Sequence, residues 1–365
     1  MDYIEAGNPG SNPKDVEFFE KVKDIRFANA KLVAFGSTRR AGIKPEEDSN
    51  LDALLRSGTG AVAIFGKSWD FHVTDVIRTT LDENLNMIYD SIVYMKQNGK
   101  EVIFDAEHFF DGYKANSDYA LKTLEMAARA GADWLVLCDT NGGSFPSEIA
   151  EIVKTVVDRF PSIPIGIHCH NDGGMAVANS IVAVEQGAVQ VQGTFNGYGE
   201  RCGNANLCTI IPNLQLKRNF YCVPPQSIAG LVSVSRYISE LANMAPNERD
   251  PYVGNCAFAH KGGMHVDAIL KNPASFEHIP PESVGNERRI LMSEVAGRSA
   301  ILGKIQKVAP WVTKASPEVQ KIMDELKRLE HEGYQFEGAE SSFELLVRRA
   351  LGKDHKFFEV KDFRV

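Results

Sequence analysis

Two histidines that stand two positions apart, His168 and His170, are the side chains best placed to do chemistry. They open the run HCHNDGG, which directly follows an apolar, β-branched segment. In a strand, residues two apart face the same side, so both imidazoles converge on one point. Two neutral imidazoles on a rigid scaffold suit a divalent metal ion. The Asn-Asp-Gly-Gly turn offers acceptors for the ring N–H groups, which favours a ligand pair over two ordinary core histidines.

A glycine-rich loop over residues 197–207 is the second candidate. It places four polar side chains among three glycines, and glycine allows the backbone to approach a ligand closely. Asn204 carries an amide oxygen that suits the same cation. A flexible, charged surface loop is the weaker interpretation, because Glu200, Arg201 and Asn204 crowd together between apolar flanks.

Glu107 lies between aromatic residues in the run FDAEHFFD and is a candidate for proton transfer. Apolar surroundings raise the pKa of a carboxyl group towards neutrality, which suits a general acid or base. Strand alternation explains an exposed charge here equally well, so the sequence leaves both interpretations open. His260 and His265 flank a Gly-Gly pair, which predicts a loop able to reach an active site, including that of a neighbouring subunit.

Short apolar segments must position these side chains. They recur at intervals of roughly 25 to 40 residues, the length of a strand-plus-helix unit. Between them lie segments of helical period, such as Leu81 to Met95 and Ile149 to Phe160. Asn12 followed by Pro13 predicts the start of a helix, and further amphipathic helices are predicted at 228–242 and 317–332. The segments are Tyr3-Ile4, Lys31 to Phe35, Ala61 to Phe65, Val102 to Phe104, Trp134 to Leu137, Ile163 to Ile167 and Val189 to Val191.

This alternation predicts an α/β fold with a parallel sheet, and its regularity favours a (β/α)₈ TIM barrel over an open sheet. Polar residues follow every predicted strand, at the rim where barrel enzymes have their active sites. Seven strands are one short of closure, so we expect a barrel that lacks its first strand, followed by a mostly helical linker region. The predicted domains are 1–222 for the barrel, 223–335 for helical linker subdomains and 336–365 for the start of a further domain. In the last of these, Phe357 to Val365 alternates like a strand.

Composition narrows the class of protein. Apolar residues make up 44% and charged residues 24% of the chain, as in globular proteins, and the net charge is −8 without a basic block. Nucleic acid is therefore not an expected partner. No apolar run is long enough to cross a bilayer and the N-terminus does not resemble a signal peptide, so we expect a cytoplasmic protein without membrane contact. The six cysteines form no CxxC pair, which suits reduced thiols.

These motifs together resemble the citramalate synthases, within the isopropylmalate and homocitrate synthase group of metal-dependent barrel enzymes. The resemblance covers nearly the whole chain and includes the runs 3–15, 34–40, 64–70, 105–113 and 138–143 beside the two motifs above. It implies a transferase that condenses acetyl-CoA with a 2-oxo acid, pyruvate above all, to give citramalate and CoA on the route to isoleucine. It also implies a divalent metal ion (Mg, Mn or Zn) and a homodimer.

The resemblance also suggests roles for individual residues. His168, His170 and Asn204 match positions at the metal, while Glu107 and His265 are the candidates for acid–base catalysis. His72 and Thr140 match substrate-pocket positions, and the rim position of Arg39 and Glu200 makes them further candidates for substrate binding.

Three departures qualify the resemblance. The Arg-Asp-Gly run that opens the first barrel strand of the group is absent, so we expect weak metal binding and weak activity from this chain alone. Phe276 stands where relatives often have a tyrosine. The C-terminal regulatory domain is short, so feedback control should be absent. The alternatives are a 2-isopropylmalate or homocitrate synthase, or a catalytically silent barrel that only binds a partner or a 2-oxo acid.

Overall fold

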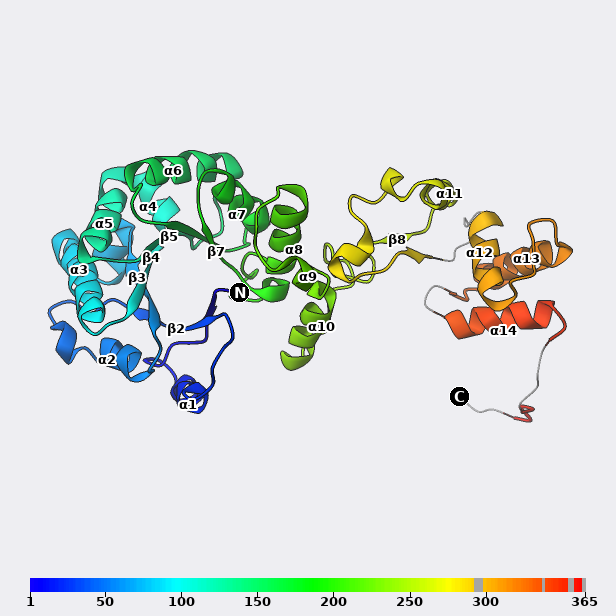
Figure 1. Ribbon diagram of the computed structural model, residues 1–365, viewed down its shortest axis with the longest axis horizontal. Coiled ribbons are helices and arrows are strands. Elements are labelled where there is room, and N and C mark those ends of the chain that lie inside the picture. The colour runs from blue at the N-terminus through cyan, green and yellow to red at the C-terminus, as the bar shows by residue number, and fades with distance from the viewer. Residues whose placement is uncertain (292–297, 337–338, 354–357, 363–365) are drawn as a thin grey trace. The chain divides into compact units, whose positions relative to one another are not determined.

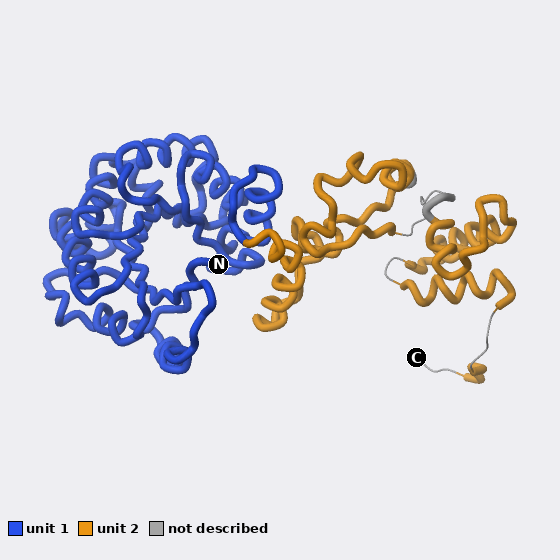
Figure 2. Tube along the Cα trace, viewed as in Figure 1, with its two compact units in different colours: residues 1–223 blue, residues 224–365 orange. Residues whose placement is uncertain are grey.

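The computed structural model describes residues 1–291, 298–336, 339–353 and 358–362. Contacts divide the chain into two compact units, Met1–Val223 and Pro224–Val365 (Figure 2). Each unit has its own hydrophobic core. We therefore describe the two units separately.

The first unit is built on one parallel sheet of seven strands in sequential order from β1 to β7. Figure 1 shows the strands curled into an inner layer with helices on the outer side. Every neighbouring pair is parallel, which confirms the predicted barrel-type α/β fold. The strands are β1 (Tyr3–Glu5), β2 (Lys31–Ser37), β3 (Ala61–Lys67), β4 (Glu101–Glu107), β5 (Trp134–Asp139), β6 (Ile165–Cys169) and β7 (Gln190–Gln192).

Helices connect the strands and cover the outer face of the sheet. Their starts follow sequence signals: the Asn12 side chain accepts a hydrogen bond from the Lys14 N–H and Pro13 occupies the first position of α1, as predicted. The α-helices are α1 (Pro13–Val22), α2 (Ser49–Arg56), α3 (Leu81–Gln97), α4 (Phe109–Ala115), α5 (Ser117–Ala130), α6 (Pro146–Arg159), α7 (Ala176–Glu185) and α8 (Leu207–Pro212). Short 3₁₀ or π turns are η1 (Pro45–Glu47), η2 (His72–Val76), η3 (Phe195–Gly197) and η4 (Asn213–Lys217).

Alternation along the strands separates two layers on the inner face of the sheet. The apolar layer is a cluster of Val33, Ala61, Ala63, Ile103, Val136 and Cys138. Side chains two positions apart share a face of the sheet. The next inward-facing side chains along each strand therefore lie at its carboxyl end, on the same inner side. Asp105, Glu107 and His168 belong to that second layer. The polar side chains at the carboxyl ends of the strands therefore lie next to the packed apolar cluster.

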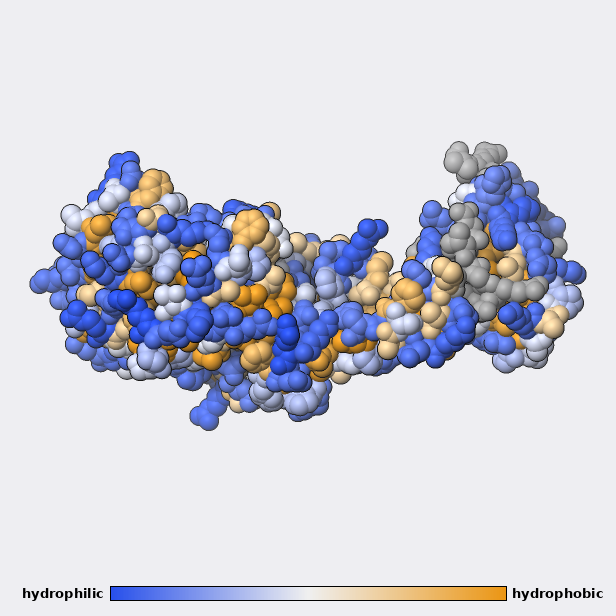
Figure 3. All heavy atoms as spheres, turned by 90° about the horizontal axis from the view of Figure 1, so that it is seen from above, coloured by the Kyte–Doolittle hydropathy of each residue, from blue (hydrophilic) through white to orange (hydrophobic). Residues whose placement is uncertain are grey.

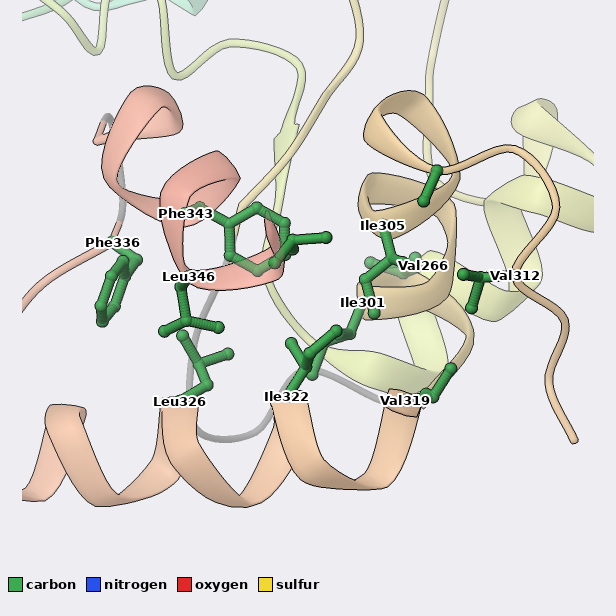
Figure 4. Packing of buried hydrophobic residues seen from close by; sticks show 12 residues of the cluster. Val266, Ile301, Ile305, Val312, Val319, Ile322, Leu326, Phe336, Phe343 and Leu346 are labelled. Atoms are coloured by element: carbon green, nitrogen blue, oxygen red, sulfur yellow. The ribbon is translucent and has the colours of Figure 1, made fainter. Parts of the chain in front are cut away.

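The second unit is mostly helical. Its elements are α9 (Pro225–Ile228), α10 (Leu231–Leu241), β8 (Ala259–His260), α11 (Gly263–Lys271), η5 (Pro273–Ser275), η6 (Pro281–Val284), β9 (Arg289–Ile290), α12 (Arg298–Val308), α13 (Pro317–His331) and α14 (Glu340–Ala350). Figure 4 shows its core, in which Val266 of α11 meets Ile305 of α12, Ile322 of α13 and Phe343 of α14. The apolar stripe predicted for the helix at 317–332 is therefore the face that α13 buries.

Three elements differ from the sequence-based prediction. The strand predicted at 163–167 is β6 at Ile165–Cys169, because Pro164 lacks the N–H that a ladder position needs. The helix predicted from 228 to 242 is two helices, α9 and α10, with Ala229 and Gly230 between them. The strand predicted at 357–365 is not found: residues 358–362 form no regular element, and the other positions lie outside the described residues.

Among the described residues, no helix is both long enough and apolar enough to cross a bilayer. In the face drawn in Figure 3, hydrophilic residues predominate and hydrophobic ones appear between them.

Candidate active site

The two imidazoles predicted to converge do so. His168 is in β6 and His170 follows it, and their Nε2 atoms lie 3.3 Å apart. The two rings are tilted by 39° with centroids 5.1 Å apart. The strand alternation that suggested the pair from the sequence is therefore what brings the two nitrogens together.

A side chain of the neighbouring strand determines which nitrogen of His168 carries the proton. Gln192 of β7 is the register partner of His168, and its Oε1 lies 2.7 Å from His168 Nδ1. The Gln192 Nε2 donates to Asp105 Oδ1 of β4 at 3.0 Å. An amide oxygen only accepts hydrogen bonds, so His168 donates from Nδ1, and in the neutral imidazole the lone pair is then on Nε2.

His170 stays neutral over a wide range of pH. Burial, with the charges of His168 and Arg201 as smaller causes, lowers the pKa of this imidazole to about 4. Its Nδ1 is buried, and the described residues give it no hydrogen-bond partner. A neutral imidazole is the form that binds a metal ion.

Asn204 adds an oxygen beside the imidazole pair. Its backbone forms an isolated antiparallel bridge with His170, and its side-chain Nδ2 donates to the Tyr198 carbonyl at 3.3 Å. The Asn204 Oδ1 is buried and has no partner among the described residues. Leaving such an oxygen unsatisfied costs about 1–3 kcal/mol, and native structures keep few such atoms.

These groups fit a divalent cation. They comprise a nitrogen lone pair on His168, a neutral imidazole on His170 and an unsatisfied amide oxygen on Asn204. No group of three or more His, Cys, Asp or Glu side chains suited to a metal occurs in the part of the chain that the structure describes. The chain therefore offers two nitrogens and one neutral oxygen, a set that suits ions of intermediate softness.

Carboxylates lie behind the imidazoles. Burial raises the pKa of Asp105 to about 7, and its hydrogen bond from Gln192 opposes the rise. Glu5, on the edge strand β1, is exposed as a whole residue, but many protein atoms surround its carboxylate. This desolvation, together with the charge of Asp105, raises the pKa of Glu5 to about 7. Glu107 at the end of β4 forms an ion pair with Lys67 at the end of β3.

A group of aromatic and histidine side chains, Trp69, His72 and His108, follows the ends of β3 and β4. The rings of His72 and His108 have centroids 4.0 Å apart, and His72 stacks on Trp69. Burial lowers the pKa of His72, with the charges of His108 and Lys67 as further causes. The His72 Nδ1 is buried without a partner among the described residues.

Thr140, after β5, is held from two sides. Its Oγ1 accepts a hydrogen bond from the His108 N–H at 2.8 Å, and its carbonyl accepts one from Arg201 Nη2 at 2.6 Å. Arg201 is fixed in turn by two hydrogen bonds to Asp172. These contacts link the turn after β5 to the 197–207 loop.

Three other predicted site residues make contacts outside the group around His168 and His170. Arg39 is 5% exposed and gives its guanidinium to Glu83 and Asp90 of α3, so it acts in the structure as a buried ion-pair partner. Glu200 is exposed, and its carboxylate lies 3.7 Å from the Arg201 guanidinium. His265 belongs to the second unit, where it is exposed and stacks on Phe276.

The sequence-based prediction gave no role to Gln192 and Glu5, and it placed Asp105 and Lys67 among the polar residues at the strand ends without a role of their own. The signal was present in each case as a polar residue inside a β-branched segment. Alternation places Asp105 on the same face as Glu107, and Gln192 on the same face as Gln190. Polar residues facing inward from a barrel strand require hydrogen-bond partners, and these come from distant strands.

Comparison with known proteins agrees with this geometry. Residues 1–237 match the HMGL-like family, and residues 252–334 match the homocitrate synthase post-HMGL domain-like family. An (R)-citramalate synthase of Aquifex aeolicus and one of Geobacter sulfurreducens are each 54% identical over 363 residues, which is 100% of this chain and 69% of the relative.

A solved structure shares the fold. The HMG-CoA lyase of Bacillus subtilis has a TM-score of 0.56 at 19% identity, over 68% of this chain and 84% of its own. This likeness supports the barrel architecture alone. Because the curated relatives match the whole chain at more than half of its positions, the protein belongs to the (R)-citramalate synthase family within the HMGL-like enzymes.

Proposed function

We propose that this chain catalyses a Claisen-type condensation of acetyl-CoA with pyruvate, followed by hydrolysis of the thioester, to give citramalate and CoA. The observation that carries the proposal is the convergence of the His168 and His170 Nε2 atoms, 3.3 Å apart at the carboxyl end of the sheet. The family to which the chain belongs supports the same reaction.

We infer that His168, His170 and Asn204 hold a divalent cation of the Mg, Mn or Zn type. When bound, such a cation polarises a ketone oxygen and stabilises the negative charge that develops on it. His168 supplies its Nε2 lone pair, and His170 stays neutral because it is buried. The unsatisfied Asn204 oxygen gains a partner in this arrangement.

Glu107 is the proposed base, and Lys67 orients its carboxylate by the ion pair. The carboxylate takes a proton from the acetyl methyl group, and the enolate carbon attacks the ketone carbon of pyruvate. The resulting alkoxide takes up a proton, and water then cleaves the C–S bond to release CoA. Thr140 contacts the backbone N–H of His108 and His72 contacts its ring, and we propose that both bind the 2-oxo acid.

The assay measures release of free thiol from acetyl-CoA with pyruvate, 2-oxoisovalerate or 2-oxoglutarate in the presence of Mg²⁺ or Mn²⁺. We expect pyruvate to give the highest kcat/KM and the product to be citramalate by chromatography. Faster release with 2-oxoisovalerate or 2-oxoglutarate would identify an isopropylmalate or homocitrate synthase instead.

Variants test the site itself. His168→Ala should reduce thiol release at least a hundredfold, because it removes one of the two imidazoles. Gln190→Met is the matched control, because Gln190 pairs with Gly166 and its buried Oε1 has no hydrogen-bond partner among the described residues, so this variant should retain the activity. Absence of thiol release from the unmodified chain, with all three acids bound, would favour a binding protein.

The remaining inferences come from the family resemblance. We propose that the product enters isoleucine synthesis, that the protein works in the cytoplasm and that it forms a homodimer in which His265 takes part in acid–base chemistry. Light scattering after size-exclusion chromatography tests the dimer. A monomer of 40.3 kDa would contradict it.

A further inference from the structure

Gln192 joins two elements that are far apart in the sequence. It is on β7, opposite His168 in the parallel register, and Asp105 is on β4, 87 residues away along the chain. One amide therefore bridges an imidazole of one strand and a buried carboxyl group of another. Asp105 is 3% exposed, so water does not compete freely for this bond.

The direction of the two hydrogen bonds is set by chemistry. An ionised carboxylate has acceptors only, so the NH₂ end of the Gln192 amide faces Asp105, at 3.0 Å. The oxygen end then faces His168 Nδ1, at 2.7 Å. The imidazole must donate to that oxygen, which leaves the His168 Nε2 with a lone pair directed at His170.

We propose that Gln192 is a positioning residue, which holds the His168 ring in the Nδ1–H tautomer by accepting from it while anchored to Asp105. The inference rests on the proposed function in one respect, namely that the His168 Nε2 lone pair is the one that binds the cation. Hydrogen-bond partners of the ring nitrogen that does not bind the metal orient metal-ligating histidines, and their removal weakens metal binding by about 10- to 100-fold.

The chain contains a matched control on the same strand. Gln190 lies two residues before Gln192, so the two side chains leave the same face of β7. Its register partner is Gly166, and its buried Oε1 has no hydrogen-bond partner among the described residues. Gln190→Met removes an amide from the same barrel wall without touching the contact to His168.

The first experiment uses the metal-free full chain with ¹⁵N-labelled histidine, at pH 8.5, where Asp105 is ionised. Long-range ¹H–¹⁵N spectra report which ring nitrogen of His168 is protonated. We expect the Nδ1–H tautomer in the unmodified chain and in Gln190→Met, and a predominant Nε2–H form in Gln192→Met. Retention of the Nδ1–H tautomer in Gln192→Met would overturn the proposal.

The second experiment exchanges the two ends of the bridge. In Asp105→Asn combined with Gln192→Glu, the carboxylate at position 192 accepts from both the His168 Nδ1–H and the amide at position 105. This double variant should restore the Nδ1–H tautomer, whereas Asp105→Asn alone frees the amide to turn and should give a mixture. A double variant that folds, as judged by circular dichroism, but shows the Nε2–H form would contradict the positioning role.

Mn²⁺ binding, followed by electron paramagnetic resonance, separates the two proposals. We expect the Kd for Mn²⁺ to rise about 10- to 100-fold in Gln192→Met and to change less than about twofold in Gln190→Met. If the unmodified chain binds no Mn²⁺, the proposed metal site fails. The tautomer spectra would still decide whether Gln192 positions His168.

Discussion

Individual atoms at the rim of the barrel are left without hydrogen bonds. The buried Nδ1 atoms of His72 and His170 and the buried Oδ1 of Asn204 have no partner among the described residues. Each such atom costs about 1–3 kcal/mol relative to a satisfied one. Because these three residues are also the candidates for binding the cation and the 2-oxo acid, we expect these ligands to supply the missing partners.

At the same scale, Arg39 shows that a polar residue after a barrel strand need not belong to the site. Its guanidinium donates to Glu83 and Asp90, and its backbone N–H donates to Ser91. We expect Arg39→Met to lower the free energy of unfolding by about 1–3 kcal/mol, because two carboxylates lose their partner. Urea titration measures this loss. The KM for pyruvate should be unchanged in the folded variant. A large rise in KM would instead support the sequence-based prediction that Arg39 binds substrate.

At the scale of elements, the loop after β7 is shaped by residues that adopt left-handed backbone conformations. Asn196, Gly197, Gly199, Arg201 and Gly203 all have positive φ values. Glycine adopts these values without steric cost, whereas other residues pay for them. The loop thereby places Asn204 against His170 and Arg201 against Asp172.

Gly203→Ala tests this loop. Gly203 has φ +92°, and a Cβ at this position would lie 1.9 Å from the Gly197 carbonyl oxygen. The backbone must shift and move Asn204, so we expect at least a tenfold loss of thiol release and of Mn²⁺ affinity. Gly60→Ala is the control, since a Cβ there meets no atom within 4 Å. Equal activity of the two variants would show that the loop geometry does not matter.

In the second unit, one buried carboxylate connects three segments. Glu277 is 7% exposed, accepts two hydrogen bonds from Arg288 at 2.6 Å and has its Oε1 3.2 Å from His260 Nε2. The bonds from Arg288 hold the pKa of Glu277 below its usual value, although burial opposes them. A depressed pKa means that the stabilisation is complete above the unfolded-state value of 4.5 and is lost as the pH falls through the folded-state value.

We therefore expect Glu277→Gln to destabilise the second unit at pH 7 and to make its stability less dependent on pH below about 4.5. Thermal unfolding at pH 7 and at pH 3.5 measures both effects. Glu344→Gln, which alters an exposed ion pair on α14, is the control and should change little. A Glu277→Gln variant whose midpoint falls as steeply with acid as the parent's would exclude this carboxylate as the cause.

At the scale of the whole molecule, the two units have separate cores. Leu124 of the first unit and Ile322 of the second are both fully buried, and Ile322 packs within the helices α11 to α14. Separate cores allow separate unfolding, because the contacts that stabilise one unit are not those of the other.

Ile322→Ala and Leu124→Ala should therefore affect different calorimetric transitions. Each substitution removes buried methyl groups and should cost about 2–5 kcal/mol in its own unit. Scanning calorimetry of the full chain would show one transition shifted by each variant. A single transition that both variants lower equally would mean that the two units unfold together.

The sequence by itself determined the strands of the parallel sheet and the pairing of the two imidazoles, because both depend on local periodicity. Apolar segments at strand-plus-helix spacing predicted the parallel sheet, and the two-residue period predicted that His168 and His170 share a face. Only the tertiary structure decided that Gln192 meets Asp105 across the inner face and that Arg39 is held by α3. Such contacts join residues about 50 to 90 positions apart, and their geometry arises when the sheet curls and the helices pack on it.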